Sequence, residues 1–269
     1  LTDHNSIQGY SEFVDERSRL AKFGEELKSE SSNYPEIKAL LDDVNRKLRL
    51  FESLFVLPGV EYEAKPGVHL LMIFPPVVSV ADLSDLLERG GYSEEDQGKD
   101  DPPIARAWDI LQAIDQAAAL GGICIAAHAD SDKGIYNALT KGKYRAEVFS
   151  HERLLAVSFK NPITAEKMMS MLRSSEYRRD MPLAFIQCSD FHGGDNEAPG
   201  RPAAYLRLDH VSFDGVKDAL LNPDEDVSLT PEPKTVELIK ALVGRPTTHV
   251  FRDVGCAESN RRMLEYICA

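Results

Sequence analysis

The stretch IQCSDFHGG, residues 186–194, ends an apolar run with two side chains of the kind that bind metals, Asp190 and His192. A strand that only completes a hydrophobic core has no use for an acid and an imidazole at its end. Because the two residues are two positions apart, an extended strand would point both side chains to the same side. The stretch therefore predicts a buried strand that delivers a pair of ligands to an active site.

Outward from this stretch, apolar runs alternate with helical segments along the whole chain. VHLLMIF (68–74), GICIAAHAD (122–130) and PLAFIQCSDFH (182–192) are predicted as buried strands. Helices are predicted at 11–28, 35–55, 104–120, 164–173, 213–223, 234–244 and 257–269. This alternation is typical of an α/β fold with a parallel sheet whose strands are covered on both faces.

The possible metal ligands share one property, which is their position at the limits of apolar runs. Five lie at or just beyond the end of a run and one at the start of a run: His4, Glu61, His128, Asp190 and His192, and then His69. In parallel α/β folds the C-terminal ends of the strands meet on one face and carry the active site. We therefore expect these six residues to meet in space, although Glu61 as a solvated acid and His69 as a core residue are the plain alternatives. The remaining histidines, His151, His210 and His249, are predicted to be structural.

The chemistry of these side chains indicates which metal they would hold. Imidazole and carboxylate ligands without thiolate suit Zn²⁺, Mn²⁺ or Fe²⁺. Six ligands exceed what one four-coordinate ion needs, so we expect at least two ions. Two ions about 3.5–4 Å apart can clamp the attacking and leaving oxygens of a phosphoryl transfer and supply a metal-bound hydroxide as the nucleophile. Neither a serine nor a cysteine nucleophile is then required.

The composition limits the class of protein. The chain has 269 residues and a net charge of −13, so it has no general attraction to nucleic acid or anionic lipid. It has no apolar run of about 18 residues, so no membrane partner is expected. The four cysteines form no C-x-x-C pair, which favours core thiols and a reducing, cytoplasmic location. The first residues of the sequence are typical of the end of a secondary-structure element, so we expect a further segment of the protein upstream of Leu1.

At these residues the sequence resembles the PHP family, named for polymerase and histidinol phosphatase. The family pattern is a His-x-His, an Asp-His, a Glu with a following His, a lone His and a closing Asp-x-His. The chain has T-D-H at 2–4, P-G-V-E at 58–61, H-L-L at 69–71, A-A-H at 126–128 and S-D-F-H at 189–192. Order and local context match across about residues 1–230. The opening His-x-His does not occur, because the sequence starts just after its place.

The resemblance implies a distorted (βα)7 barrel over residues 1–250, with a helical insertion at about 11–55 and a C-terminal helical extension or linker at 251–269. It also implies two to three divalent ions, Zn, Mn or Fe, held by His4, Glu61, His69, His128, Asp190 and His192. Asp3 would orient His4 from outside the ligand set. Arg201 is a candidate phosphate contact, because a guanidinium matches phosphate geometry, and Lys133 and Asp130 are weaker candidates.

A closer resemblance is to the PHP module of bacterial proteins that fuse it to an AAA-type or SMC-like ATPase region. It rests on V-H-L-L-M-I-F, G-G-I-C-I-A-A-H and F-D-G-V-K-D-A-L-L-N-P. The sequence has no glycine-rich phosphate loop that ends in Gly-Lys-Ser/Thr. An ATPase partner, fused or associated, would therefore lie outside this chain.

Three functions follow from these observations. The leading hypothesis is a metal-dependent phosphoesterase that hydrolyses a phosphomonoester or a nucleic-acid phosphodiester, with a nucleotide or nucleic acid as substrate. The second is a catalytically incomplete PHP module that regulates an attached ATPase, which the absent first motif favours. The third is an amidohydrolase-type metal hydrolase, because that class also gathers His and Asp at strand ends.

Overall fold

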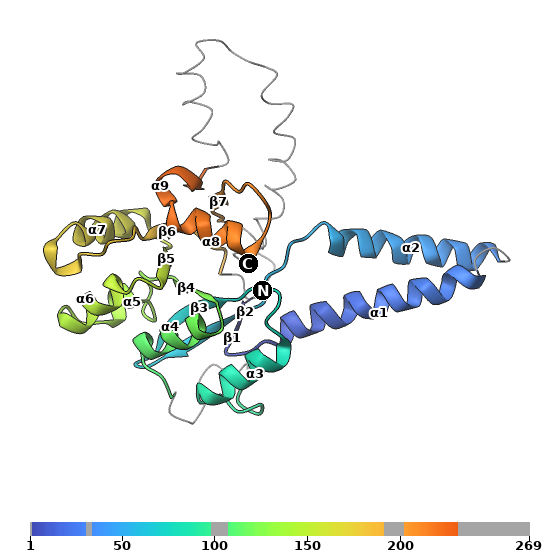
Figure 1. The fold of residues 1–269 in the computed structure, drawn as a ribbon, viewed down its shortest axis with the longest axis horizontal. Coiled ribbons are helices and arrows are strands. Elements are labelled where there is room, and N and C mark those ends of the chain that lie inside the picture. Colours follow the sequence, from blue (N-terminus) through green and yellow to red (C-terminus); the bar gives the residue numbers. More distant parts are fainter. Residues whose placement is uncertain (1, 31–33, 98–106, 191–201, 231–269) are drawn as a thin grey trace, which may run out of the picture.

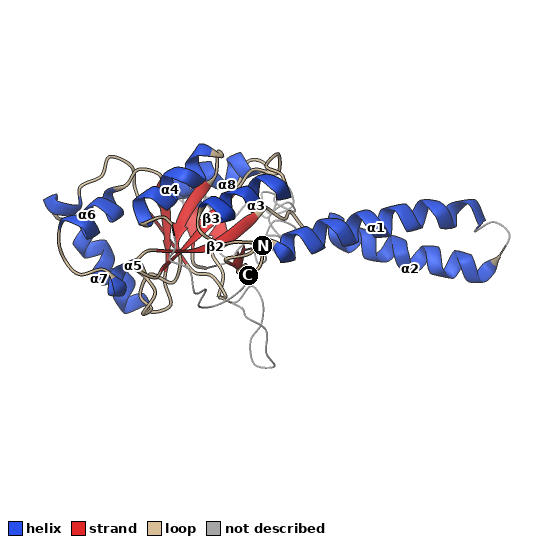
Figure 2. Cartoon of the chain, turned by 90° about the horizontal axis from the view of Figure 1, so that it is seen from below, coloured by secondary structure: helices blue, strands red, loops and turns tan. Residues whose placement is uncertain are grey.

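The computed structural model describes residues 2–30, 34–97, 107–190 and 202–230. These residues form a body built around a β-sheet and a long pair of helices that projects from it (Figures 1 and 2). The helices predicted at 234–244 and 257–269 lie outside the described residues, as does the predicted extension at 251–269. None of the helices in the described ranges has both the length and the apolar character needed to cross a bilayer.

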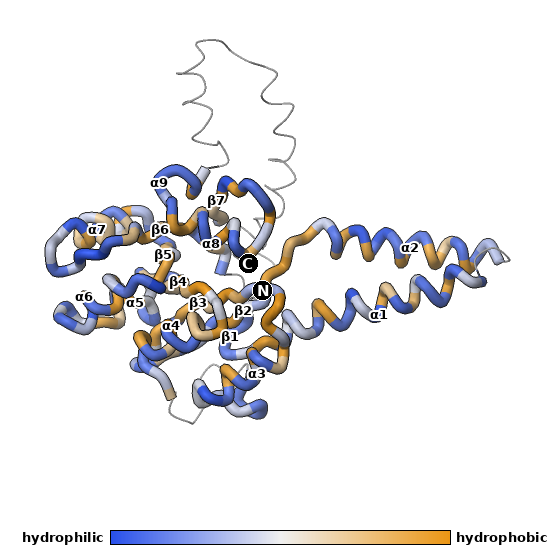
Figure 3. Tube along the Cα trace, in the orientation of Figure 1, coloured by the Kyte–Doolittle hydropathy of each residue, from blue (hydrophilic) through white to orange (hydrophobic). Residues whose placement is uncertain are grey.

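The projecting pair consists of α1 (Gln8–Glu30) and α2 (Pro35–Glu52), which correspond to the helices predicted at 11–28 and 35–55, although α1 begins earlier and ends later than predicted. Figure 3 shows apolar and polar positions alternating along both helices, as expected where each helix buries one stripe. Leu20 and Val44 are buried between them. A Cβ atom at Gly24 would lie 3.3 Å from Val44 Cγ1, so the glycine lets the helices approach closely.

The sheet has six strands in the order of the chain. They are β1 (Thr2–His4), β2 (Gly59–Ala64), β3 (Val68–Ile73), β4 (Ile123–Ala126), β5 (Leu154–Ser158) and β6 (Ala184–Ile186). All run parallel to one another except β3, which is antiparallel to both β2 and β4. The expectation of a parallel sheet is therefore wrong for this strand.

A tight turn explains the direction of β3. After β2 the chain turns at Pro66 and Gly67, and Gly67 N donates to Ala64 O at 2.7 Å. Gly67 has a φ of 117°, a conformation that suits glycine. A turn this short cannot hold the crossover of a dozen or more residues that a parallel connection needs.

The closed barrel predicted from the family resemblance is not confirmed. Within the described ranges β1 and β6 are the two edges of the sheet. A separate pair, β7 (Tyr205–Leu206) and β8 (Val227–Ser228), is antiparallel. The fold class is thus mixed α/β, with a sheet in which parallel pairing predominates.

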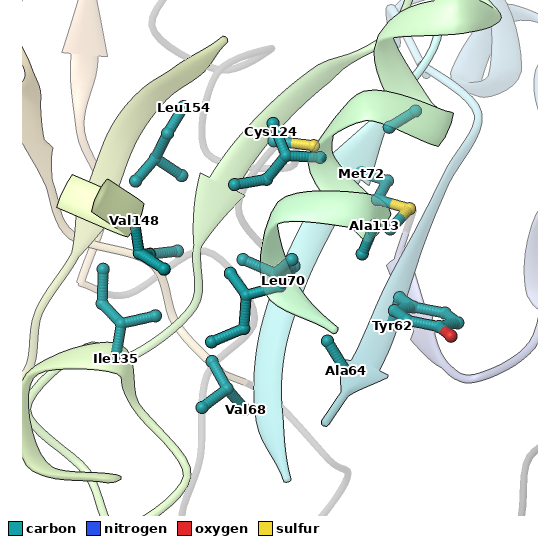
Figure 4. Close-up of a cluster of buried hydrophobic side chains, with 14 of the residues drawn as sticks. Tyr62, Ala64, Val68, Leu70, Met72, Ala113, Cys124, Ile135, Val148 and Leu154 are labelled. Atoms are coloured by element: carbon teal, nitrogen blue, oxygen red, sulfur yellow. The ribbon is translucent and has the colours of Figure 1, made fainter. Parts of the chain in front are cut away.

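Helices cover both faces of the sheet, as Figure 1 shows for α3 and α4 on one side and α8 on the other. The first face packs against α3 (Val80–Arg89), α4 (Ile110–Ala119), α5 (Ile135–Ala138), α6 (Lys143–Ser150) and α7 (Pro162–Leu172). Figure 4 shows side chains of β2 to β5 pointing into this cluster. The second face packs against α8 (Phe213–Leu221), which α9 (Pro223–Asp226) follows; a short 3-10 helix, η1 (Ser175–Tyr177), precedes β6.

Capping residues decide where two of the predicted helices begin. Asp109 and Gln112 form a capping box, so α4 begins at Ile110 and Trp108 lies before the helix. The segment 104–106 of the predicted helix lies outside the described residues. In α7 the N-cap is Asn161, whose side chain accepts from Ile163 N, so the helix begins at Pro162, two residues before the predicted start at 164.

Candidate metal centre

The direction of the strands brings the predicted ligands to one end of the sheet. This end, where β1, β2 and β4 finish and β3 begins, is the edge meant from here on. Because β3 is antiparallel, its first residues lie at the same edge as the last residues of β1, β2 and β4. His4 pairs with Glu61 in the register, and His69 pairs with Glu63. Paired residues and alternate residues of a strand point to the same face. The four side chains therefore share one face at one edge, with His69 at the start of its strand.

The backbone is unusual at the same edge. In the described part of the chain, the non-glycine residues with positive φ are Asn5 (47°), His128 (26°) and Asp190 (50°). Each follows a strand that ends at this edge. Such conformations are costly for residues with a Cβ and cluster at functional sites. His128 is held in place by its own N–H, which donates to Ser158 Oγ at 2.6 Å.

Three side chains meet at the centre of the cluster. His69 Nδ1 lies 2.7 Å from Glu61 Oε1, and His128 Nε2 lies 3.1 Å from the same oxygen. The two imidazole nitrogens are themselves 3.1 Å apart. Two nitrogens at this distance around one carboxylate oxygen can share a proton or a cation. Glu61 and His69 are each only 7% exposed, so the contact is shielded from solvent.

Glu61 belongs to two groups of possible ligands. One group is His4, Glu61 and His69, and the other is Glu61, His128 and Asp190. In each group one ligand atom from every residue lies within 4.8 Å of the others. A carboxylate has two oxygens, so Glu61 can contact an ion in each group. The arrangement fits two neighbouring cations joined by one acid.

Neighbouring polar groups orient the imidazoles. Ser131 Oγ lies 2.7 Å from His128 Nδ1, and Asn5 Nδ2 lies 3.0 Å from His4 Nε2. With a metal ion bound, His128 Nδ1 would carry the proton and donate to Ser131 Oγ, which would leave the Nε2 lone pair of His128 for the ion. Partners of this kind fix the tautomer and direction of metal-binding histidines.

The electrostatics favour an ionised carboxylate at Glu61 and a neutral imidazole at His4. Burial raises the pKa of Glu61, but hydrogen bonds and charges from His128 and His69 outweigh it and hold that pKa well below its usual range. Burial lowers the pKa of His4, and the neighbouring His69 lowers it further. A carboxylate and a neutral imidazole are the forms that bind metal ions.

The donor set fits a divalent transition metal. His69 Nε2 is buried and has no hydrogen-bond partner in the described residues, as expected of an atom that awaits a ligand. Nitrogen and oxygen donors without sulfur suit Zn²⁺, Mn²⁺ or Fe²⁺. Cys124 lies in the apolar cluster, where burial raises the pKa of its thiol to about 12.

The structure brings together five of the six predicted ligands: His4, Glu61, His69, His128 and Asp190. His192 and the predicted phosphate contact Arg201 lie outside the described residues. The carboxylate of Asp3 accepts from Gly9 N at the start of α1, and no contact with His4 is described for it. Asp130 accepts from Lys160 N and Asn161 N, so its carboxylate ties two loops together.

Glu63 and Lys160 belong to the cluster and were not predicted from the sequence, whereas Lys133 was a weaker candidate for a phosphate contact. Glu63 is 1% exposed, and Lys133 Nζ lies 3.5 Å from its Oε2. Lys160 Nζ pairs with Asp190 Oδ2 at 2.5 Å. A signal for Glu63 did exist, because an acid two positions after Glu61 in a strand points to the same face.

The comparisons with known proteins identify no family for this chain. No protein-family model matches it, and no curated protein matches it by sequence. A lesion-specific endonuclease from Pyrococcus furiosus aligns with a TM-score of 0.44 and 17% identity over 61% of this chain, which spans only 38% of that protein. A candidate metal-dependent phosphoesterase from Bifidobacterium adolescentis aligns with a TM-score of 0.42 and 13% identity, over 81% of this chain and 83% of that one. Because both TM-scores are below 0.5, we draw the function from the side chains alone.

Proposed function

We propose that this chain is a metal-dependent phosphoesterase. The observation that carries the proposal is the Glu61 carboxylate, which two groups of histidine and acid ligands share at one edge of the sheet. Two adjacent cations are the arrangement that stabilises the attacking and leaving oxygens of a phosphoryl transfer. The substrate class we propose is a phosphomonoester or a nucleic-acid phosphodiester.

The ligands of the proposed centre are His4, Glu61, His69, His128 and Asp190, with His192 added from the sequence pattern. When bound, two to three divalent ions would polarise the phosphate and bring the pKa of a water molecule toward neutrality. Ser131 would keep the Nε2 lone pair of His128 directed at the centre.

Local positive charge would have to attract the substrate, because the whole chain is acidic, with a net charge of −13. Lys160 is a suitable group: its side chain is 58% exposed and its ammonium lies beside Asp190. Arg201 keeps the role of a proposed phosphate contact from the sequence.

The finer assignments rest on the sequence motifs. We propose a PHP-type domain over residues 1–250 with a barrel-like closure, and an AAA-type or SMC-like ATPase region as a partner. A cytoplasmic location is proposed from the pattern of cysteines.

Metal analysis combined with turnover tests the function. We would measure bound Zn, Mn and Fe and the hydrolysis of p-nitrophenyl phosphate and bis-p-nitrophenyl phosphate. The wild type is compared with His128→Ala and Asp190→Ala. His151→Ala serves as a matched control, because His151 is a half-buried histidine that precedes β5 at the opposite edge of the sheet.

The expected result is bound metal and hydrolysis of at least one ester in the wild type and the control, with both reduced in the two cluster variants. Absence of bound transition metal in the wild type would overturn the proposal. Bound metal without hydrolysis of either ester would favour the regulatory PHP module. Hydrolysis of amides without hydrolysis of phosphate esters would favour an amidohydrolase.

A further inference from the structure

We propose that Glu63 is a further metal ligand, which together with His4 and His69 holds one ion, and that the ammonium of Lys133 competes with this ion. The inference rests on the proposed function in one respect, because both need metal at this cluster. It adds a ligand, Glu63, that the sequence pattern does not contain. It also adds a lysine, Lys133, whose charge sets the metal affinity of the site formed with this ligand.

The burial of Glu63 is the first step. The residue is 1% exposed, near the end of β2, and its backbone N–H donates to Asn5 Oδ1 at 2.8 Å. Removing a carboxylate from water is costly unless positive charge or hydrogen bonds compensate for it. Lys133 Nζ lies 3.5 Å from Glu63 Oε2, but the Lys133 side chain is 44% exposed. A carboxylate buried this deeply beside a partly solvated ammonium is well placed to accept a divalent cation.

The distances around Glu63 match those around a tetrahedral ion. Glu63 Oε2 lies 3.6 Å from His4 Nε2 and 3.7 Å from His69 Nε2. Both separations are too long for hydrogen bonds. Ligands bound at about 2.0–2.2 Å in a tetrahedral arrangement are themselves about 3.4 Å apart. Glu63 Oε2 therefore lies about as far from each of the two imidazole nitrogens as it would with an ion bound to that oxygen and that nitrogen.

The orientation of His69 is the second, independent observation. Contacts of its Nδ1 with Glu61 and His128 fix the ring, and they leave Nε2 on the Glu63 side. This Nε2 is buried and has no hydrogen-bond partner in the described residues. An ion between Glu63 and His69 would give this nitrogen a partner.

His4 has a ready lone pair for the same position. Asn5 Nδ2 lies 3.0 Å from His4 Nε2, so the amide can donate to an unprotonated Nε2. An ion would take the lone pair that Asn5 now contacts.

Substitution of Lys133 should change the metal affinity in the opposite direction to substitution of Glu63. Its ammonium and the ion would be attracted to the same oxygen and would repel each other. The flexible and partly exposed side chain can move into solvent when the ion binds. Removing the charge of Lys133 should therefore tighten metal binding, whereas removing the charge of Glu63 should weaken it.

The experiment measures metal affinity and stoichiometry without relying on turnover. Zn²⁺ binding to the full chain is followed by competition with a chromophoric chelator, and bound zinc is counted by mass spectrometry. The variants are Glu63→Gln and Lys133→Gln. Glu147→Gln and Lys143→Gln are the matched controls, because these residues form an ion pair on α6 with Nζ 3.4 Å from Oε1.

We expect Glu63→Gln to lose one equivalent of zinc or to weaken one site at least about 10-fold, the lower limit seen for indirect metal partners. Lys133→Gln should tighten the same site several-fold, and the controls should match the wild type. Wild-type protein that binds zinc, with unchanged affinity in Glu63→Gln, would overturn this inference and leave the phosphoesterase proposal intact. Wild-type protein that binds no metal would overturn both. If Glu63→Gln does not fold by circular dichroism, Lys133→Gln decides: tighter binding supports the inference, and unchanged or weaker binding overturns it.

Discussion

One face of the sheet is divided into two halves with opposite chemistry. Along β3, His69, Leu71 and Ile73 point to this face. Leu71 and Ile73 join an apolar cluster with α8, whereas His69 joins Glu61 and Glu63 at the edge. The change from apolar to ionisable side chains takes two residues.

The two halves contribute differently to the protein. In the apolar half, burial removes hydrocarbon from water and stabilises the fold. In the polar half, burial of acids and imidazoles costs free energy, and left-handed backbone at Asn5, His128 and Asp190 adds to that cost. Because the polar half lowers the stability of the fold and is still tightly organised, its residues are better explained by a role in ligand binding or catalysis than by a role in folding.

The largest expected effect is on turnover in the polar half. Glu61→Gln keeps the shape of the side chain but removes the charge that both ligand groups share. Loss of one stabilising donor in an active site costs about 100–1,000-fold, so loss of a shared ligand should cost about 1,000-fold or more. Ester hydrolysis per folded molecule is the measurement, and Glu166→Gln on α7 is an exposed control. Near-normal turnover in Glu61→Gln would show that Glu61 is not a ligand of the metal centre.

The apolar half should respond in stability instead. Ile125 is 4% exposed in β4 and packs in the cluster with α8. Ile125→Ala should lower the free energy of unfolding by about 2–5 kcal/mol, and Ile125→Val by about 0.5–1.5 kcal/mol. Chemical denaturation measures both, and turnover per folded molecule should remain close to wild type. If the Ala variant lost turnover without losing stability, the division of the face would be wrong.

Removal of metal from the polar half should lower the stability of the whole fold. A ligand that binds only the folded state, present at 100 times its Kd, stabilises that state by about 2.7 kcal/mol. Chelation of the metal should therefore lower the thermal midpoint of the wild type by several degrees and that of Glu61→Gln by much less. Equal shifts in the two proteins would place the metal elsewhere.

A smaller effect is expected just outside the ligands. Ser131→Ala removes the hydroxyl that lies 2.7 Å from His128 Nδ1. Loss of such a partner typically weakens metal binding about 10–100-fold. Chelator competition measures this loss, with Ser170→Ala on α7 as an exposed serine control. An unchanged affinity would show that the loop from 128 to 134 orients His128 without the hydroxyl.

The sequence by itself determined the local features of this protein. Apolar runs located β3 and β4, and helical periodicity located α1 and α2, because both patterns depend on residues near one another in the chain. Ligand chemistry was also readable, since His4, Glu61, His69, His128 and Asp190 do lie together. Their role as ligands remains a prediction for the experiments above.

Only the tertiary structure decided how these pieces meet. The turn at Pro66 and Gly67 reverses β3, and this reversal carries His69 to the edge where the other strands end. The register of β2 against β1 and β3 places Glu63 opposite His69 and Glu61 beside His4. Strand direction and register arise from turns and pairing between distant segments, so residue patterns within one segment cannot fix them.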